Sequence, residues 1–213
     1  MENISPRERR AQKTHRAILD AARKIINQKG IAALSMRAIA NAIDYSPAGL
    51  YEYFGSKEEI IGAVIEEGFQ RFTHHLQQVD QSLPVEEYAI ELGIAYIDFA
   101  VGYPDFFLLM FTTAPLIPNF ELGEADCSPQ ERLSKQPSFN ILLQAVQRGV
   151  DEGAFQPQAE LGIFEMAYAS WSLVHGIAML RVAMLKEMAL GYASVDRAVI
   201  QALHRGMRGQ VTQ

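Results

Sequence analysis

Residues 34–59, LSMRAIANAIDYSPAGLYEYFGSKEE, hold the pattern that decides the fold of this 213-residue chain. Apolar residues at helical spacing end at Ile43 and resume at Leu50 and Phe54, after an interruption at residues 44–46. The stretch therefore predicts one helix, a tight turn and a second helix. A helix fits the major groove of B-DNA and a preceding helix can brace it across the backbone, so this helix-turn-helix is typical of DNA binding.

Capping residues mark where these helices begin. Ser35 and Ser46 are good N-caps, and Pro47 takes the first helical position, where its missing N–H is not needed. Ser56 and Glu59 have the spacing of a capping box and predict the start of a long helix with a wide apolar face. We therefore expect the motif to continue directly into a helix that links it to the rest of the chain.

The composition is typical of a soluble globular protein, with 49% hydrophobic and 21% charged residues. The longest apolar run, residues 106–111, is far shorter than the roughly 20 residues that span a bilayer, and the N-terminus is polar and basic. A single cysteine, Cys127, excludes an intrachain disulfide and a cysteine zinc site. We expect a cytoplasmic protein in a reducing compartment, with no membrane partner.

Charge is distributed unevenly along the chain. Residues 1–57 hold 10 Lys and Arg against 5 Asp and Glu, whereas residues 58–213 hold 9 against 20, so a head of +5 precedes a body of −11. Several of the head's cations crowd the start of the first expected helix, where the macrodipole disfavours them. They favour contact with DNA phosphates over a merely solvated arm. These cations are Arg7, Arg9, Arg10 and Lys13.

Helical spacing covers most of the chain, and no segment shows sustained period-two alternation, so we expect an all-α protein of about nine helices. Prolines predict a long loop over residues 113–138, with at most one short turn of helix. The architecture expected is a three-helix head over residues 1–56 and a larger helical body over residues 57–213. The expected helices span residues 7–29, 36–43, 47–53, 57–79, 84–102, 105–112, 139–152, 159–188 and 195–207.

Three segments of the head resemble the N-terminal domain of the TetR family of transcriptional regulators in order and spacing: AILDAARKIINQKG, SMRAIANAI and SPAGLYEYFGSKEEI. The resemblance covers roughly residues 11–61. In the body, Tyr103-Pro104 with LLMF, and Trp171 with Val174-His175-Gly176, resemble the C-terminal domain of the TetR subgroup named for a Trp, His, Gly signature. The resemblance implies a homodimeric repressor that responds to a small-molecule effector, with dimerisation through the last two helices and an effector pocket within residues 57–213.

The same resemblance assigns DNA contacts around the turn. It places residues 46–49 in the groove and the hydroxyls of two tyrosines at phosphates, although core packing of one tyrosine is the alternative. The small Ala48 and Gly49 would let the second helix approach base edges closely. Lys57 stands at a helix N-terminus, which is a ready phosphate site. The residues expected at DNA are Ser35, Met36, Arg37, Ser46, Pro47, Ala48, Gly49, Tyr51, Tyr53 and Lys57.

Two residues depart from what the motif leads us to expect. Asp44 stands at the turn where the family commonly has glycine, but Asp tolerates the left-handed region better than most residues, so the turn should survive. Glu52 lies in the expected recognition helix, where its carboxylate could accept from a cytosine amine. We expect it instead to pair with a nearby arginine.

The effector pocket implied by the resemblance needs concave apolar surface with a few polar groups. Aromatic and methionine side chains at helical spacing are more often core than ligand site, so each candidate below has core packing as its alternative. A hydrogen-bonded core histidine, or an interface contact, is likewise the alternative for His175. The candidates are Phe72, Tyr96, Phe99, Phe107, Met110, Phe111, Trp171, His175 and Met179.

Other classes of protein find less support in the sequence. An all-α enzyme would need a catalytic constellation, but the five histidines form no metal spacing with carboxylates and there is no glycine-rich phosphate loop. We expect no metal and no cofactor. A dimeric ligand-binding or adaptor protein without operator binding is the second alternative. Repressor and activator, the effector and the operator sequence are not distinguished by these residues.

Overall fold

The computed structural model describes residues 5–113, 128–185 and 191–208. Within these ranges the chain is all-α, as predicted, and its one β-type contact is an isolated bridge between Gln158 and Leu161. A single 3-10 turn (Ile31–Ala33) and a π-helical turn (Leu109–Thr113) complete the described structure. The helices are α1 (Pro6–Lys29), α2 (Met36–Ala42), α3 (Pro47–Leu50), α4 (Lys57–Gln77), α5 (Val85–Gly102), α6 (Pro104–Leu108), α7 (Pro129–Lys135), α8 (Pro137–Asp151), α9 (Ile163–Ala183) and α10 (Tyr192–Met207).

Two sequence predictions need correction here. The recognition helix is shorter than expected, because α3 ends at Leu50 and residues 51–53 form turns. The predicted loop over residues 113–138 is wrong at its C-terminal end, where α7 forms and α8 already begins at Pro137. Ser128 starts α7 with a full capping box to Glu131, so the prolines there begin helices rather than prevent them. Cys127 and the rest of that loop lie outside the described residues.

The described residues form two compact units. The first holds residues 5–68 and 105–113, and the second holds residues 69–104 together with everything described from residue 128 on. The boundary at residues 68 and 69 falls inside α4, so one continuous helix contributes to both units.

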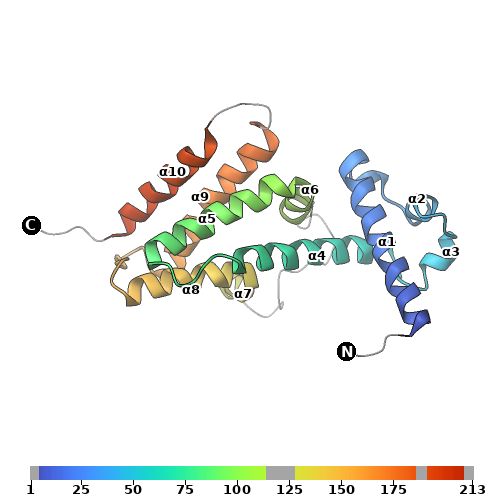
Figure 1. Ribbon diagram of the computed structural model, residues 1–213, viewed down its shortest axis with the longest axis horizontal. Helices are drawn as coiled ribbons and strands as arrows, with labels where there is room; N and C mark the ends of the chain where they lie inside the picture. Colours follow the sequence, from blue (N-terminus) through green and yellow to red (C-terminus); the bar gives the residue numbers. More distant parts are fainter. Residues whose placement is uncertain (1–4, 114–127, 186–190, 209–213) are drawn as a thin grey trace, which may run out of the picture. The chain divides into compact units, whose positions relative to one another are not determined.

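In the first unit, α2 packs on α1 and α3 on α2 (Figure 1). The side chains of Ile18, Ile39, Leu50 and Ile60 are completely buried. Each lies on the apolar stripe of its own helix, so the hydrophobic effect alone fixes which faces meet. Phe54 closes this core, and its ring stacks on the imidazole of His15 at 4.7 Å.

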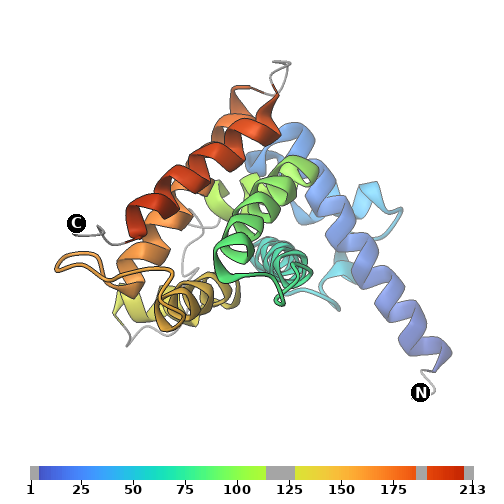
Figure 2. The same ribbon diagram turned by 60° about the vertical axis from the view of Figure 1, so that its left-hand side comes forward.

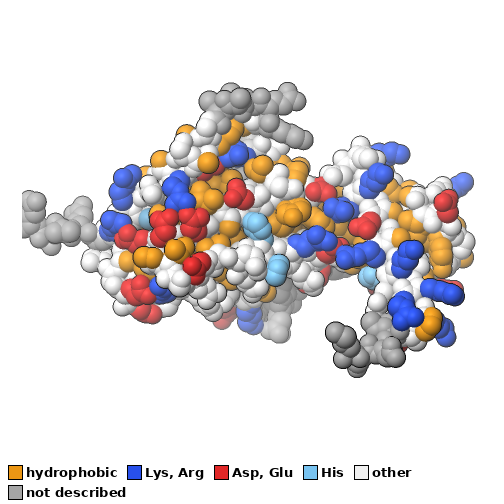
Figure 3. Space-filling model, viewed as in Figure 1, with side chains coloured by type: hydrophobic (Ala, Val, Ile, Leu, Met, Phe, Trp, Pro, Cys, Tyr) orange, Lys and Arg blue, Asp and Glu red, His pale blue; other side chains and the backbone are white. Residues whose placement is uncertain are grey.

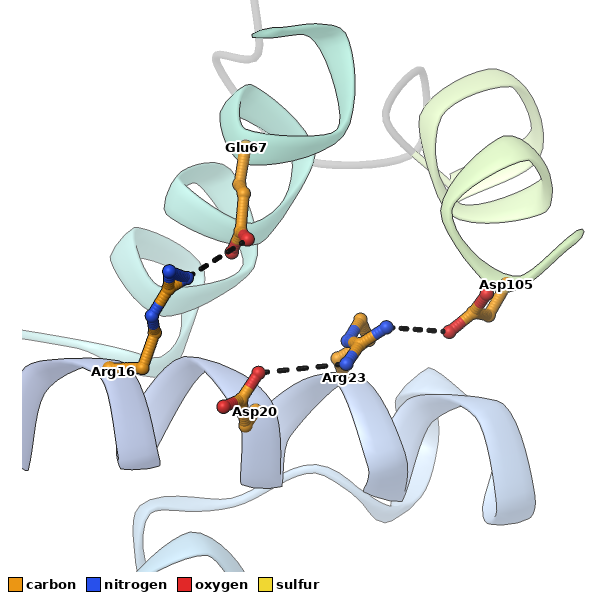
Figure 4. Close-up of polar contacts among 5 residues, drawn as sticks. All are labelled: Arg16, Asp20, Arg23, Glu67 and Asp105. Carbon is orange, nitrogen blue, oxygen red and sulfur yellow. Dashed lines mark hydrogen bonds and ion pairs between the residues drawn. The ribbon is translucent and has the colours of Figure 1, made fainter. Parts of the chain in front are cut away.

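Polar contacts attach α6 to α1 within the first unit (Figure 4). Arg23 Nη1 lies 3.1 Å from Asp105 Oδ2, and the guanidinium also covers the ring of Phe106 at 4.8 Å. On the same face of α1, Arg16 pairs with Glu67 of α4 at 3.6 Å. Residues 105–113 thus contact a helix about 80 residues earlier in the chain. No local sequence pattern predicts this contact.

Gly68 lets α4 and α6 approach closely inside the same unit. A Cβ atom added to Gly68 would lie 2.8 Å from Met110 Sδ and 3.1 Å from a ring carbon of Phe106. Both distances are shorter than ordinary carbon contacts, so a larger residue here would push α6 and the π-helical turn away.

The second unit is built around α5, which packs against α8, α9 and α10 (Figure 2). Its core includes Phe139, Phe155, Met166 and Met207, all at most 5% exposed. Arg181 of α9 and Asp196 of α10 form an ion pair at 2.5 Å whose carboxylate is 7% exposed. The attraction within a buried pair is largely offset by the cost of removing both charges from water, so the pair need not add net stability.

Helix α9 is apolar on all sides yet poorly covered. By length and composition alone it could cross a membrane, a test that a buried core helix of a soluble protein also meets, and 28% of its most apolar window is buried. The exposed positions of α9 include a stripe at four-residue spacing: Tyr168, Ser172, Gly176, Leu180 and, at the C-cap, Met184; Glu165 and Ala183 are also exposed. The large apolar side chains exposed on this stripe are those of Tyr168, Leu180 and Met184.

Candidate nucleic-acid interface

The turn between α2 and α3 is built on Asp44. Its φ of 52° is the one positive φ of a non-glycine residue in the described ranges. The backbone N–H of Tyr45 then donates to the carbonyl of Ala40 at 2.9 Å, which closes the turn against the end of α2. The expectation that Asp would support the turn in place of glycine is therefore confirmed.

Helix α3 is fixed by its first and last residues. The Ser46 hydroxyl accepts from Gly49 N at 3.0 Å, so the predicted N-cap is present. Leu50 and, beyond the helix, Phe54 are buried beneath it, and the N–H groups of Tyr53 and Phe54 both donate to the Leu50 carbonyl. The opposite side is exposed at residues 46–48. A helix that is buried on one side and exposed on the other can enter the major groove.

Tyr51 is the most exposed aromatic residue of this segment, at 58% of its surface. Tyr53 is half-buried, and its ring meets that of Tyr45 edge to face with centroids 6.3 Å apart. Neither of the two predicted contact tyrosines is a core residue. Both lie where their hydroxyls could donate to phosphate oxygens.

Tyr45 is the residue of this site that the sequence analysis missed. Its ring lies over Gly49, where an added Cβ would be 2.6 Å from Tyr45 Cε1 and 3.1 Å from Cδ1. Gly49 was expected to leave room for DNA, but in the structure the space beside it holds a tyrosine ring. A bulky residue four positions before a helical glycine was the available signal.

The start of α4 supplies a second cluster of polar groups. Ser56 Oγ accepts from Glu59 N at 3.1 Å, as predicted, but the Glu59 carboxylate accepts from Gly55 N at 2.6 Å rather than from the cap residue itself. Lys57 is exposed at the first helical position, with its Nζ 3.8 Å from Glu58. The ammonium group can therefore turn toward a phosphate at a small electrostatic loss.

The remaining expected contacts lie at the start of α2. Ser35 caps this helix by accepting from Ala38 N at 3.1 Å, and its hydroxyl proton stays available for a phosphate oxygen. Arg37 is exposed and Met36 is half-buried. On the face shown in Figure 3, Lys and Arg side chains gather over the first unit, and a dense group of Asp and Glu lies over the second.

Glu52 does not form the predicted ion pair. It is exposed, and no lysine or arginine of the described ranges bonds to its carboxylate. Its negative charge lies beside Tyr51 and Tyr53, and so next to any phosphate that they bind. A carboxylate in that position repels the DNA backbone unless it accepts from a base amine.

The nine candidate pocket residues divide between the two units. Phe107, Met110 and Phe111 belong to the first unit, and the other six belong to the second. In the second unit, Trp171 Nε1–H donates to the Tyr96 oxygen at 3.3 Å, and the Tyr96 oxygen lies 2.8 Å from His175 Nδ1. The Phe72 ring meets Tyr96 edge to face at 5.0 Å.

Burial sets the proton positions in this aromatic cluster. It raises the pKa of Tyr96, which therefore remains protonated, and it lowers the pKa of His175. A neutral imidazole can accept at Nδ1 from the Tyr96 hydroxyl while Trp171 donates to the same oxygen. Trp171 Nε1, the Tyr96 hydroxyl and His175 Nδ1 are thus paired with one another.

The described part of the second unit also holds an open groove of about 510 Å³. It contains none of the nine candidates. Its lining comes from α5, α10 and the residues next to them: Pro84, Glu86, Glu87, Ile90, Gln201, Arg205 and Arg208.

Comparison with known families matches both parts of the chain. Residues 18–64 match the family described as bacterial regulatory proteins, tetR family, and residues 89–203 match the tetracyclin repressor-like C-terminal domain. The second match alone covers more than half of the sequence. The Trp-His-Gly subgroup expected for the C-terminal domain is not confirmed.

Relatives of known sequence are also DNA-binding regulators. The HTH-type transcriptional regulator UidR of Escherichia coli is 33% identical over 92 residues, which are 43% of this chain and 47% of UidR, so the match takes in about half of that relative's length. The HTH-type transcriptional repressor NicS of Pseudomonas putida is 26% identical over 152 residues, 70% of this chain and 69% of NicS.

Solved structures share the fold. GusR of Salmonella enterica superposes with a TM-score of 0.66 at 21% identity, covering 91% of this chain and 96% of its own. A tetR-family regulatory protein from Rhodococcus RHA1 gives a TM-score of 0.69 at 17% identity, with 92% and 97% coverage. Proteins of this family are regulators of transcription and not enzymes. From its N-terminal helix-turn-helix to its C-terminal helical domain, this chain belongs to the TetR family of transcriptional regulators.

Proposed function

We propose that the chain binds a palindromic operator as a homodimer, represses the adjoining gene and is released by a small-molecule effector. The observation that carries operator binding is the two-sided character of α3. Leu50 is buried beneath it, while the polar or small residues at positions 46–48 and the Tyr51 side chain are exposed on its other side. This arrangement supports base contacts at the start of α3 and phosphate contacts at Tyr51, Tyr53 and Lys57.

The uncovered stripe of α9 supports a dimer through the last two helices. α10 carries a similar stripe of small or apolar exposed residues, Val195, Ala198, Val199 and Ala202, which repeats at helical spacing. A surface of this kind on two neighbouring helices fits a second copy of the same chain, because a two-fold axis can pair each stripe with its equivalent. Two copies would then present two helix-turn-helix motifs to two half-sites.

Effector release is proposed to act through α4. This helix contributes to both units, and its residues Phe72 and Leu76 are buried in the unit that holds the Tyr96 cluster. Two states of the chain would differ in the position of α4. An effector that binds the second unit in only one of these states shifts the population toward that state. DNA binding is then lost in proportion to the difference in effector affinity between the two states.

The test is a band-shift titration with labelled duplexes from the region upstream of the gene. We expect the wild-type chain to shift one duplex, and Tyr51→Ala to lose that shift while sedimenting as the same dimer. Retention of full affinity by Tyr51→Ala would remove α3 from the interface.

A ligand-binding or adaptor protein that does not bind an operator is the alternative, and the acidic total charge is compatible with it. Salt separates the two functions. Operator binding through several phosphates should weaken steeply as salt rises from about 50 to 200 mM, whereas an adaptor shows no specific shift at either concentration.

A further inference from the structure

We propose that Tyr45 is a positioning residue for DNA recognition: its ring fills the space that Gly49 leaves over α3 and meets the ring of Tyr53 edge to face. The proposal rests on the operator binding proposed above. Tyr45 is thereby part of the recognition element even though it lies in the turn before the helix.

The backbone conformation at position 49 does not require a glycine. Gly49 lies in α3 with an ordinary helical backbone, since the positive-φ glycines described are Gly30 and Gly153. A helical glycine is less stable than alanine at the same position. The backbone gives no reason for that loss, but the Tyr45 ring does, because an alanine Cβ would overlap Cε1 at 2.6 Å.

The Tyr45 ring is held in place from two sides. The left-handed Asp44 and the bond from Tyr45 N to the Ala40 carbonyl fix the backbone on one side of the ring. On the other side stands the edge of Tyr53. Turn, α3 and the proposed phosphate contact at Tyr53 are therefore joined through one side chain.

A double-mutant cycle on Tyr45 and Gly49 tests whether the Tyr45 ring is the reason that position 49 must be a glycine. Binding to the upstream duplex is followed by fluorescence anisotropy, and the thermal midpoint of each variant by circular dichroism. Gly49→Ala is expected to weaken binding by about tenfold and to lower the midpoint by several degrees, as overpacking does. In a Tyr45→Ala background, Gly49→Ala should neither weaken binding nor lower the thermal midpoint further.

The matched control is Tyr45→Phe with Gly49→Ala, which keeps the ring and should be as impaired as Gly49→Ala alone. An equal loss from Gly49→Ala with and without the ring would overturn the proposal, because Gly49 would then serve DNA or the helix directly. Wild-type binding and midpoint in Gly49→Ala would overturn it as well. If the wild-type chain shifts no duplex, the proposal of operator binding fails. The thermal midpoints of the four variants still show whether the Tyr45 ring and Gly49 are sterically coupled.

Discussion

At the scale of single residues, the charge of Lys57 should have a measurable effect on the proposed binding to DNA. Its side chain is 45% exposed at the first position of α4. Replacement by glutamine should weaken binding to all sequences alike and reduce the slope of log affinity against log salt by about 1, because one phosphate contact is lost. The exposed Lys24 of α1, changed to glutamine, is the control and should leave the slope unchanged. Equal slopes for wild type and Lys57→Gln would exclude this contact.

His204 makes stability depend on pH. Its ring is 5% exposed and Nδ1 has no hydrogen-bond partner among the described residues. Burial, reinforced by the charge of Arg208, lowers its pKa from 6.5 to about 4. Between these values the unfolded chain binds a proton that the folded chain does not, so the folded state loses stability as pH falls below 6.5.

We therefore expect His204 to contribute about 2 kcal/mol to the fall in the free energy of unfolding between pH 7 and pH 5. His204→Leu should remove most of this drop, whereas a change at the exposed His74, to glutamine, should not. Urea titrations at the two pH values measure it. An unchanged pH dependence in His204→Leu would assign the effect to other groups.

The residue scale also shows where sequence reasoning succeeds. Ser35, Ser46 and Asp44 act through their own backbone neighbours, so their roles follow from local rules. Tyr45 and Glu52 depend on which side chains a turn brings near them, and a single sequence does not contain that geometry. Glu52 was expected beside an arginine, and the fold supplies none within the described ranges.

At the scale of elements, two glycines of α4 offer a matched comparison. Gly68 faces Met110 and Phe106 closely, whereas a Cβ on Gly62 meets nothing within 4 Å. Gly62→Ala should stabilise the chain by about 0.5–1 kcal/mol through helix propensity. Gly68→Ala should instead destabilise it by about 1–3 kcal/mol, because α6 must move. Chemical denaturation of both variants checks the prediction, and equal effects would refute the close approach.

The helix ends explain what could be foreseen at this scale. α1, α2, α4, α5 and α8 follow from apolar spacing and capping residues. α7 was missed because Pro129 and Pro137 were interpreted as loop residues, although each starts a helix. The end of α3 at Leu50 was missed because the apolar periodicity continues through Phe54. The change from helix to turns is visible only in the hydrogen bonds, since the N–H groups of Tyr53 and Phe54 both donate to the Leu50 carbonyl.

At the scale of the whole molecule, the exposed α9 stripe makes a prediction about assembly. Leu180, 47% exposed, should be buried between two copies. Leu180→Glu should therefore give a folded monomer by sedimentation and lower operator affinity by about a hundredfold or more, because two half-sites no longer act together. Gln77→Glu adds the same charge on an exposed polar position and should remain dimeric. A dimeric Leu180→Glu would move the interface elsewhere.

The placement of residues 105–113 is the feature of the whole molecule that the sequence hides. They follow α5 directly, yet they share a unit with residues 5–68. Arg23 and Asp105 make the connection across 82 positions. Periodicity reports which face of a helix is apolar, but not which distant helix will cover it.

The course of α4 through both units has a consequence for how the chain denatures. Its first turns bury Ile60 and Val64 in one core, and its last turns bury Phe72 and Leu76 in the other. An unbroken ladder of backbone hydrogen bonds joins the two ends, so melting either core leaves half of a cooperative helix without support. Differential scanning calorimetry should accordingly record a single heat-absorption peak, with equal calorimetric and van't Hoff enthalpies, for a chain that contains two cores.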